Sequence, residues 1–380
     1  MILSAKYELM RKNFRNFAET EFTTEITDKL DREGGFNWEI WEKMGKYGFT
    51  GCKIPVEYGG QGGDSLAYVL MNEEFARVSP VLSIYANTPN SLGGGPLLAC
   101  GNKEQLEKYL VPAAKGEKMI VFALTEPGAG SDAGSMTTKA VADGDYYVLN
   151  GRKCFISGAP VADYAIVYAR TNMNVKGSRG ISMFIVDMKL PGVSCGKPEE
   201  KMGISGYPTR DIVLENVRVH KSDLLGPLDK GYAVAMSTLD GGRLGMAAEA
   251  LGIAQACLEE SIQYSKDRKQ FGKPISYNQG ISFMLADMAT EIQAARELVY
   301  STAVAKDAGD KNSSMMCSMS KYFATEMANR VAAMAVQIHG GYGFIKEYKV
   351  ERLYRDARVY TLFEGTSQVQ QMVIARNLLK

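Results

Sequence analysis

Histidine is scarce in this chain: His220 and His339 are the only two among 380 residues. A zinc site rich in histidine is therefore excluded, and a serine or cysteine nucleophile that needs a histidine base is not expected. The six cysteines include no Cys-x-x-Cys pair, and their spacing indicates no metal site. We expect them to be buried free thiols in a reducing compartment.

An excess of one charge and a long apolar run are also missing. The 44 Lys and Arg residues nearly balance the 43 Asp and Glu residues, which argues against a nucleic acid partner and against a polybasic membrane anchor. No apolar run reaches the ~20 residues that a membrane span needs. The first residues, MILSAKYELMRK, do not resemble a secretory signal. We therefore expect a cytoplasmic protein without a membrane partner.

The length allows two or three domains with sizeable cores. Residues 1–118 favour helices, because Leu9, Phe14 and Phe17 fall on one face of a first helix and Asn37 suits the N-cap of a second. In this part we expect helices over 38–47, 66–78 and 103–110, with loops over 57–64 and 90–95.

The pattern changes to period two near Met119. Asp143-Gly144 and Asn150-Gly151 both predict two-residue hairpin turns. Strands are expected over 146–149, 164–170, 182–186 and 212–219. Strands bounded by turns, with no helices between them, predict an antiparallel β-barrel or sandwich over residues 119–227.

Residues 228–380 favour helix again. The stretch over 225–260 is rich in alanine, leucine and methionine. Further helices are expected over 278–306, 312–338 and 366–379, which together predict a C-terminal antiparallel four-helix bundle. The expected fold class is thus α+β with three domains, in the order helical, β and helical.

The most informative stretch is Phe122–Asp132, FALTEPGAGSD. A short apolar run is followed by a turn through Gly128 and Gly130, where exposed backbone N–H groups can cradle an anion. By itself this is more often a plain structural turn. It is not a Walker A loop, because no Gly-Lys-Ser/Thr follows, and strands rather than a helix come after it, unlike a dinucleotide fingerprint.

Other stretches carry residues suited to chemistry, although each also has an ordinary structural interpretation as a hairpin, a solvated turn or a helix cap. Asp240 and Arg243 are three residues apart on a helix and share a face, as a surface ion pair would. The remaining stretches are NGRKCFIS over 150–157, RKQFGKP over 268–274, QIHGGYG over 337–343 and YTLFEGTSQ over 360–368.

Together these stretches resemble the acyl-CoA dehydrogenase family, over essentially the whole chain. The family patterns are T-E-P-G-A-G-S-D, N-G-x-K-x-W-I-T, R-x-x-F-G-x-x, Q-x-x-G-G-x-G and Y-E-G-T-S-E-I-Q. The resemblance implies FAD as cofactor, Glu364 as the catalytic base and no metal. The implied cofactor-binding residues are Phe122, Leu124, Thr125, Gly130, Ser131, Phe155, Ile156, Ser157, Arg268, Phe271, Gln279, Gln337, Gly340, Gly341, Thr366 and Gln368. The implied substrate-binding residues are Ser131, Leu239, Asp240, Arg243 and Gly365.

This chain departs from the family patterns at several positions. Phe155 and Ser157 stand where the family often has Trp and Thr, and both keep the ring or the hydroxyl. Phe363 replaces the usual Tyr and Gln368 a frequent Glu, while Gly158 replaces a frequent Asn for no reason visible in the sequence. Some family members carry their base at the position of Gly242, which a glycine cannot supply.

The implied function is α,β-dehydrogenation of an acyl-CoA to a trans-2-enoyl-CoA, with electrons passed to electron-transferring flavoprotein by a homotetramer built from dimers. Gly242, Thr88 and Pro89 suggest a short acyl chain, or a short chain with a planar substituent. Two alternatives stay open. The first is the same site acting as an enoyl-CoA reductase of the acrylyl or caffeyl type. The second is a non-catalytic flavin- or CoA-binding subunit that docks a partner, which the retention of Glu364 disfavours.

Overall fold

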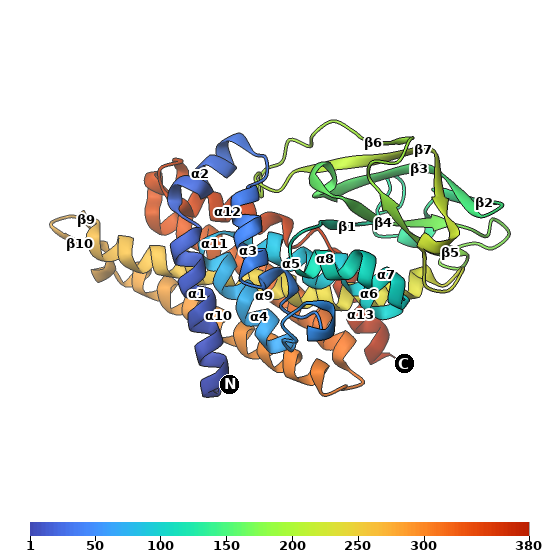
Figure 1. The fold of residues 1–380 in the computed structure, drawn as a ribbon. Helices are drawn as coiled ribbons and strands as arrows, with labels where there is room; N and C mark the ends of the chain where they lie inside the picture. The colour runs from blue at the N-terminus through green and yellow to red at the C-terminus, as the bar shows by residue number, and fades with distance from the viewer. Residues whose placement is uncertain (380) are drawn as a thin grey trace.

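The structure is a computed structural model that describes residues 1–379. An eight-stranded sheet lies at one end, N-terminal helices cover the middle, and long C-terminal helices run beneath both (Figure 1). The predicted three-part α+β organisation is confirmed.

The first region consists of short and medium helices. They are α1 (Ala5–Glu21), α2 (Thr24–Glu33), α3 (Trp38–Lys46), α4 (Ser65–Val78), α5 (Pro80–Thr88), α6 (Gly95–Cys100), α7 (Lys103–Gln105) and α8 (Val111–Ala114). Asn37 caps α3 as predicted, because its Oδ1 accepts from the backbone N–H of Ile40 at 3.0 Å. The predicted face of α1 is right for Phe14 and Phe17, which are buried, and wrong for Leu9, which is 60% exposed.

The loop predicted over residues 90–95 is wrong. The chain stays helical there, as the π-helical segment η3 (Pro89–Gly93) that joins α5 to α6. Glycine serves close packing here rather than a turn, since a Cβ on Gly93 would lie 2.6 Å from the carbonyl oxygen of Ile120. The segment thereby packs directly on the first strand of the sheet.

The middle region contains β1 (Ile120–Ala123), β2 (Lys139–Asp143), β3 (Tyr146–Ser157), β4 (Tyr164–Arg170), β5 (Ile181–Asp187), β6 (Val193–Cys195), β7 (Thr209–His220) and β8 (Leu224–Leu225). The strand order is β6-β7-β3-β2-β4-β5-β8, and β1 pairs with β4. Most neighbours are antiparallel as predicted, but β1 runs parallel to β4, and β2 meets β4 in parallel at one residue pair.

The second predicted hairpin turn, Asn150-Gly151, is wrong. These residues lie inside the twelve-residue strand β3, at an irregularity in its register with β7. Gly151 is required by close approach, because a Cβ there would lie 2.3 Å from Oγ1 of Thr138. The first predicted turn is present, with Asp143 pairing with Tyr146 across the β2–β3 hairpin.

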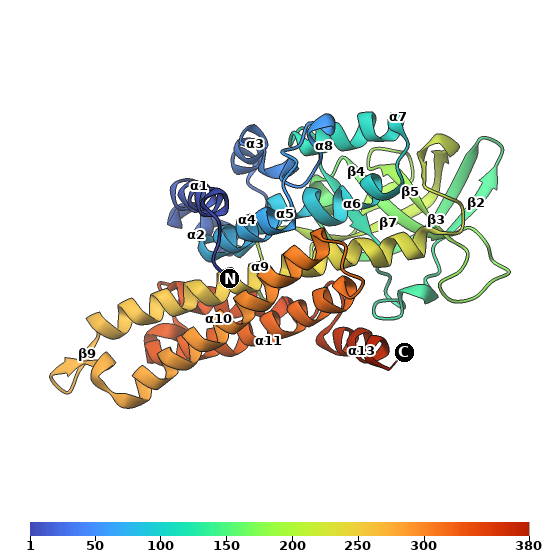
Figure 2. The same ribbon diagram turned by 90° about the horizontal axis from the view of Figure 1, so that it is seen from below.

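The C-terminal region is built on α9 (Gly231–Asp267), α10 (Gln279–Asp307) and α11 (Ser313–His339). Figure 2 shows these three helices lying alongside one another, with the β9–β10 hairpin (Lys269–Gln270 and Lys273–Pro274) at the end away from the sheet. The helices α12 (Lys349–Val359) and α13 (Ser367–Leu378) pack on α11. Helix α12 was not predicted.

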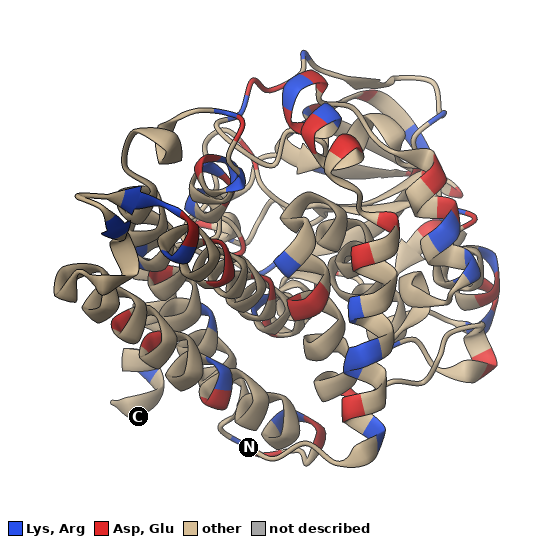
Figure 3. Ribbon diagram, turned by 90° about the vertical axis from the view of Figure 1, so that its left-hand side faces the viewer, with Lys and Arg blue, Asp and Glu red and all other residues tan. Residues whose placement is uncertain are grey.

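Acidic and basic residues are interspersed on the face seen in Figure 3. Within residues 1–379 no helix is long and apolar enough to cross a membrane. All six cysteines of the described chain are free thiols, of which Cys100 and Cys195 are only partly buried.

Helix α9 packs against α4 through a glycine, which generates a stability prediction. A Cβ on Gly252 would lie 2.3 Å from the carbonyl oxygen of Glu73. Gly252→Ala must shift backbone and should destabilise the protein by about 1–3 kcal/mol. The matched control is Gly241→Ala on the same helix, where no described atom lies within 4 Å and alanine should favour the helix by up to ~1 kcal/mol. Urea unfolding midpoints of the two variants should move in opposite directions, and equal midpoints would contradict the packing.

Candidate active site

The two predicted cofactor segments of the sheet lie side by side. The backbone N–H of Cys154, in β3, donates to the carbonyl oxygen of Thr125, at the turn after β1, at 2.9 Å. Beyond it, Gly128 and Gly130 face open space, with no described atom within 4 Å of a Cβ built on either. The turn therefore presents a backbone surface that a ligand can approach closely.

A buried ion pair holds this turn in place. Lys153 Nζ donates to Glu126 Oε1 at 2.8 Å and to the carbonyl oxygen of Leu124 at 3.0 Å, and the Lys153 side chain is fully buried. Glu126 also accepts from the backbone N–H groups of Thr137 and Thr138 at 2.6 and 2.9 Å. Burial acts to raise the pKa of the Glu126 carboxyl, but the charge of Lys153 and these hydrogen bonds outweigh it and lower that pKa to about 2.

Neither Lys153 nor Glu126 was among the predicted site residues, although both lie inside the motifs. A lysine within a strand that pairs on both sides could have suggested a buried partner. Their role is to position the backbone of residues 124–126, since neither side chain reaches the surface.

The predicted cofactor residues of the two segments divide into two groups. Leu124 and Ile156 are buried in the core, so they can meet a ligand only through their backbone. Phe155 is instead 66% exposed and has a left-handed backbone with φ of 56°. An exposed aromatic ring can stack on a flat ligand. A left-handed backbone at a residue other than glycine is strained, and such strain is often found at functional sites. Ser157 lies next to it, with Oγ 3.2 Å from Oγ1 of Thr209.

Glu364 lies in the connection between α12 and α13. Its backbone is left-handed, with φ of 50°, and Gly365 follows with φ of 90°. A Cβ on Gly242 of α9 would lie 2.1 Å from Glu364 Oε2. The carboxylate therefore occupies the space that any side chain at residue 242 would need.

Two cations lie near this carboxylate. Lys321 on α11 donates to the carbonyl oxygen of Gly365 at 2.7 Å, and Arg243 on α9 is paired with Asp240 at 2.7 Å. The Asp240–Arg243 pair was predicted as an exposed pair on the ordinary interpretation, which is wrong: Arg243 is buried. Within the described chain, Glu364 Oε2 and Arg243 Nε are both buried without a hydrogen-bond partner.

Burial dominates the ionisation of these groups. It raises the pKa of Glu364 to about 7, against the opposing charges of Lys321 and Arg243. Burial likewise lowers the pKa of the Lys321 ammonium to about 8. A carboxyl with a pKa near neutrality can both take up and release a proton, which is the requirement for a general acid or base.

A second buried carboxyl, Glu249 on α9, was missed by sequence reasoning. Its Oε1 accepts from Asn87 at 2.9 Å and from Ser83 at 3.1 Å, and its Oε2 accepts from the Tyr360 hydroxyl at 2.7 Å. Burial raises its pKa to about 8, which these hydrogen bonds oppose only in part. Glu249 thus ties α5 to Tyr360, four residues before Glu364.

Four further predicted substrate- or cofactor-binding residues differ in their exposure to solvent. Leu239 and Gly365 are partly buried, and Gln368 and Ser131 are exposed. The Thr366 hydroxyl accepts from the backbone N–H of Val369 and caps α13.

A second cluster of predicted residues lies at the opposite end of the molecule, beside the β9–β10 hairpin (Figure 2). Arg268, Gly340 and Gly341 line a cavity of about 550 Å³, with the Arg268 guanidinium 5.1 Å from the ring centre of Tyr342. Phe271, Gln279 and Gln337 are exposed near it. His339 is packed rather than free, stacking on Tyr264 at 4.1 Å.

Comparison with known sequences decides the family. The sequence models of the acyl-CoA dehydrogenase N-terminal, middle and C-terminal domains match residues 4–117, 121–217 and 229–379. The chain belongs to the acyl-CoA dehydrogenase family.

Members of the family that resemble this chain include both reductases and dehydrogenases. It is 57% identical to subunit CarC of the caffeyl-CoA reductase-Etf complex of Acetobacterium woodii and 56% identical to the 3-(aryl)acrylate reductase of Clostridium sporogenes, each over the full length of both chains. The structure of butyryl-CoA dehydrogenase from Megasphaera elsdenii matches with a TM-score of 0.96 at 41% identity, and all of both chains is covered.

The residues of this acyl-CoA dehydrogenase fit FAD, the cofactor of the family. The open glycine turn at 128–130 and the exposed ring of Phe155 suit a phosphate-bearing, flat cofactor, and the cavity at Arg268 offers a cation for phosphate oxygens. Within the described chain, Glu364 Oε2 and Arg243 Nε are buried polar atoms that still lack a hydrogen-bond partner.

The Lys153–Glu126 pair generates the first site prediction. Lys153→Met should leave a buried carboxylate unpaired and cost about 3–5 kcal/mol, with loss of bound FAD as the turn loosens. Thermal unfolding and the FAD absorbance retained after gel filtration measure both effects. Lys153→Met combined with Glu126→Gln should recover part of the stability. The exposed control Lys176→Met should change neither, and a Lys153→Met variant as stable as that control would refute the assignment.

Glu249 generates a pH-dependent prediction. Because the pKa of Glu249 is raised from 4.5 in the unfolded chain to about 8, its contribution to stability is full below pH 4.5 and is lost as pH rises toward 8. Glu249→Gln cannot ionise, so its stability relative to wild type should increase with pH, by on the order of 1 kcal/mol per unit of pKa shift removed. Denaturant unfolding at pH 5 and pH 8.5 tests this, with exposed Glu42→Gln as the control. The prediction would be contradicted if the difference in unfolding free energy between Glu249→Gln and wild type were the same at both pH values.

Proposed function

We propose that this chain interconverts a short-chain acyl-CoA and its trans-2-enoyl-CoA with FAD, using Glu364 as the group that moves the α-proton. The observation that carries the proposal is the placement of Glu364: its Oε2 is buried, unpartnered and pressed against Gly242. No side chain at 242 competes for this position.

The roles of the residues follow from their contacts. FAD supplies the hydride chemistry at the β-carbon when it is bound. Glu364 accepts the α-proton during dehydrogenation and donates it in the reverse direction. Its left-handed backbone fixes the direction of the carboxylate. Lys321 binds the carbonyl oxygen of Gly365 and limits the rise in the pKa of Glu364 by its charge. Asp240 orients Arg243, and Leu239, Gly365 and Ser131 are assigned to the mouth of the substrate site.

The opposite direction, reduction of an enoyl-CoA, is the second candidate. The two relatives above 55% identity are both named as reductases of aryl-substituted acrylates or caffeyl-CoA. A pKa of Glu364 near 7 supports either direction, because the carboxyl is then protonated in a large fraction of molecules and can donate as well as accept. Electron-transferring flavoprotein is the proposed electron partner in both, supported by the Etf complex of the first relative. The buried, unpartnered carboxyl oxygen of Glu364 also disfavours a subunit that only docks a partner.

The two clusters of cofactor residues support a homo-oligomer. Arg268, Gly340 and Gly341 line one cavity, and Arg268 directly precedes the β9–β10 hairpin. That hairpin lies at the end of the bundle away from β3, the strand that carries Phe155 (Figure 1), so one chain does not bring both clusters to a single FAD. A neighbouring copy would supply the missing cluster, which supports a homotetramer built from dimers. We place the domain boundaries at 118/119 and 227/228, in the connections before β1 and before α9, and the free thiols support a cytoplasmic location.

Glu364→Gln tests the proposed function. The variant should fold, remain yellow and bind acyl-CoA, because an amide keeps the shape of the carboxyl. It should lose flavin reduction by acyl-CoA, and flavin reoxidation by enoyl-CoA, by roughly 10²–10⁴-fold. Stopped-flow absorbance under anaerobic conditions measures both half-reactions. The exposed control Glu347→Gln should match wild type; a Glu364→Gln enzyme that is equally fast would show that another residue moves the proton.

A further inference from the structure

A hydrogen-bond network links Lys201, in the loop between β6 and β7, to the exposed end of β3. Lys201 Nζ donates to Oγ1 of Thr209 at 3.1 Å, and that atom lies 3.2 Å from Oγ of Ser157. Thr209 is the first residue of β7 and Ser157 the last of β3, and the two are paired across the sheet. Thr209 is buried, whereas Ser157 and Phe155 are exposed. The network therefore leads from a lysine, through a buried hydroxyl, to an exposed hydroxyl on the proposed flavin segment.

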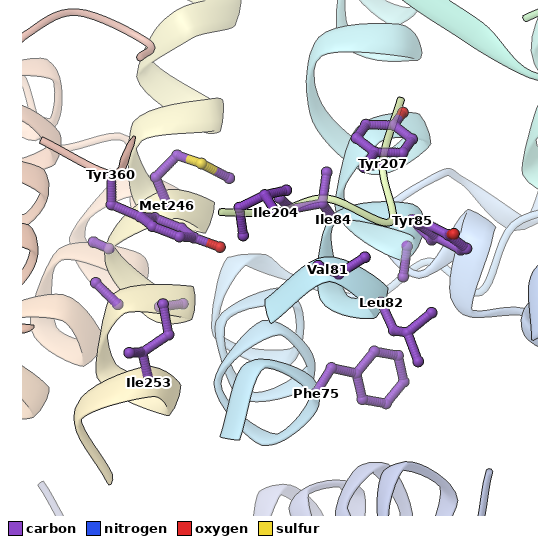
Figure 4. Packing of buried hydrophobic residues seen from close by; sticks show 14 of the residues in the cluster. Phe75, Val81, Leu82, Ile84, Tyr85, Ile204, Tyr207, Met246, Ile253 and Tyr360 are labelled. Atoms are coloured by element: carbon purple, nitrogen blue, oxygen red, sulfur yellow. The ribbon is translucent and has the colours of Figure 1, made fainter. Parts of the chain in front are cut away.

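The loop that carries Lys201 is fixed against the helices. The backbone N–H of Ile204 donates to Oδ1 of Asp356, in α12, at 2.6 Å. The hydroxyl of Tyr85, in α5, donates to the carbonyl oxygen of Gly206 at 2.8 Å. Figure 4 shows the segment that carries Ile204 running through the buried cluster of hydrophobic side chains. Lys201 is thus attached to a segment that is held on two sides.

The ammonium of Lys201 has no negative charge in direct contact. Both of its hydrogen bonds within the described chain go to uncharged oxygens, the carbonyl of Tyr207 at 2.6 Å and the hydroxyl of Thr209. Burial lowers the pKa of Lys201 to about 8, against the opposing charge of Asp356. The ammonium is therefore protonated in most molecules at pH 7, and its charge acts on the groups that it contacts.

The ammonium also sets the direction of the hydrogen bonds. It has only donors, so Thr209 Oγ1 accepts from Lys201. The single proton of the Thr209 hydroxyl then has two acceptors in reach, the carbonyl oxygen of Tyr207 at 3.4 Å and Ser157 Oγ at 3.2 Å. The carbonyl already accepts from Lys201, and the positive charge turns the hydroxyl proton away from the ammonium. Thr209 therefore donates to Ser157, which leaves the proton of Ser157 to be donated to a ligand.

We propose that Lys201 is a positioning residue for the flavin: through Thr209 it makes Ser157 a hydrogen-bond donor to FAD, and it thereby raises the reduction potential of the bound cofactor. A donor bond and a nearby positive charge both favour the electron density that reduction adds to the ring. The inference rests on the proposed function, because it takes Phe155 and Ser157 as the flavin segment. None of the five family patterns contains Lys201 or Thr209.

The test is the midpoint potential of the FAD-loaded enzyme at pH 7, measured by a spectroscopic redox titration against a reference dye without substrate. Lys201→Met should lower the equilibrium constant for two-electron reduction by roughly tenfold, the size expected for one hydrogen bond to a charged group. This corresponds to a potential lower by about 30 mV. Lys201→Arg keeps a cation and should stay near the wild-type value. The control is Lys197→Met, which changes an exposed lysine of the same loop and should leave the potential unchanged.

Thr209→Val tests the hydrogen-bond network separately, because valine keeps the shape of the side chain and leaves Lys201 in place. The variant should lower the potential in the same direction as Lys201→Met. Thr209→Ser retains the hydroxyl and should stay near the wild-type value. If Lys201 only held its loop, Lys201→Met would change stability or the amount of FAD retained, but the potential of the retained FAD would equal that of wild type.

The outcomes separate this inference from the proposed function. If Lys201→Met and Thr209→Val retain FAD at the wild-type potential, the inference is wrong and the proposed function stands. If Lys201→Met does not retain FAD, the potential of Thr209→Val decides in the same way. If the FAD of the wild type is neither reduced by an acyl-CoA nor reoxidised by an enoyl-CoA, the proposed function fails. The dye titration, which uses no substrate, still decides the role of Lys201 in that case.

Discussion

The active site depends on an exclusion of volume: the carboxylate of Glu364 occupies the space that a side chain at residue 242 would fill. Helix α9 can therefore carry no Cβ at this turn, and Glu364 must reach α9 from a left-handed backbone. Each half of the arrangement requires the other. A larger residue at 242 would displace the carboxylate, and a right-handed backbone at 364 would point it elsewhere.

The same helix carries two groups that affect the ionisation of this carboxylate in opposite directions. Arg243 follows Gly242 directly, and Glu249 lies two turns further along, where it binds Tyr360. Burial raises the pKa of both Glu364 and Glu249 toward neutrality, and a negative charge on one disfavours a negative charge on the other. Lys321 and Arg243 offset part of this cost for Glu364. The protonation of Glu364 is thus a property of the cluster rather than of one residue.

Local patterns predicted the elements well where local forces determine them. The strand over 164–170 and the cap at Asn37 are present as predicted, because alternation and capping depend on neighbours in the chain. The hairpin turn predicted at Asn150-Gly151 was wrong because Gly151 is required by the close approach of Thr138. The loop predicted over 90–95 was wrong because Gly93 is required by the close approach of Ile120. The sequence alone does not distinguish a glycine required by close packing against a distant segment from a glycine required by a turn.

The site shows the same division. The motifs predicted which residues bind the cofactor and substrate but not their contacts, and the structure brings Thr125 to Cys154 and Glu364 to Gly242. The roles assigned to those residues stay predictions until they are tested. Nothing in the sequence indicated that Arg243 and Glu249 are buried, because burial is a property of packing between elements.

Gly158 illustrates how a departure from a family pattern acquires meaning from structure. In the sequence it is an unexplained glycine beside a segment expected to bind flavin; in the fold it lies against the hydroxyl of Tyr207, 49 residues further along the chain. The two residues must therefore change together, since any side chain at 158 would meet the ring. Both glycines make room for a polar group: Gly242 for the carboxylate of Glu364, and Gly158 for the hydroxyl of Tyr207.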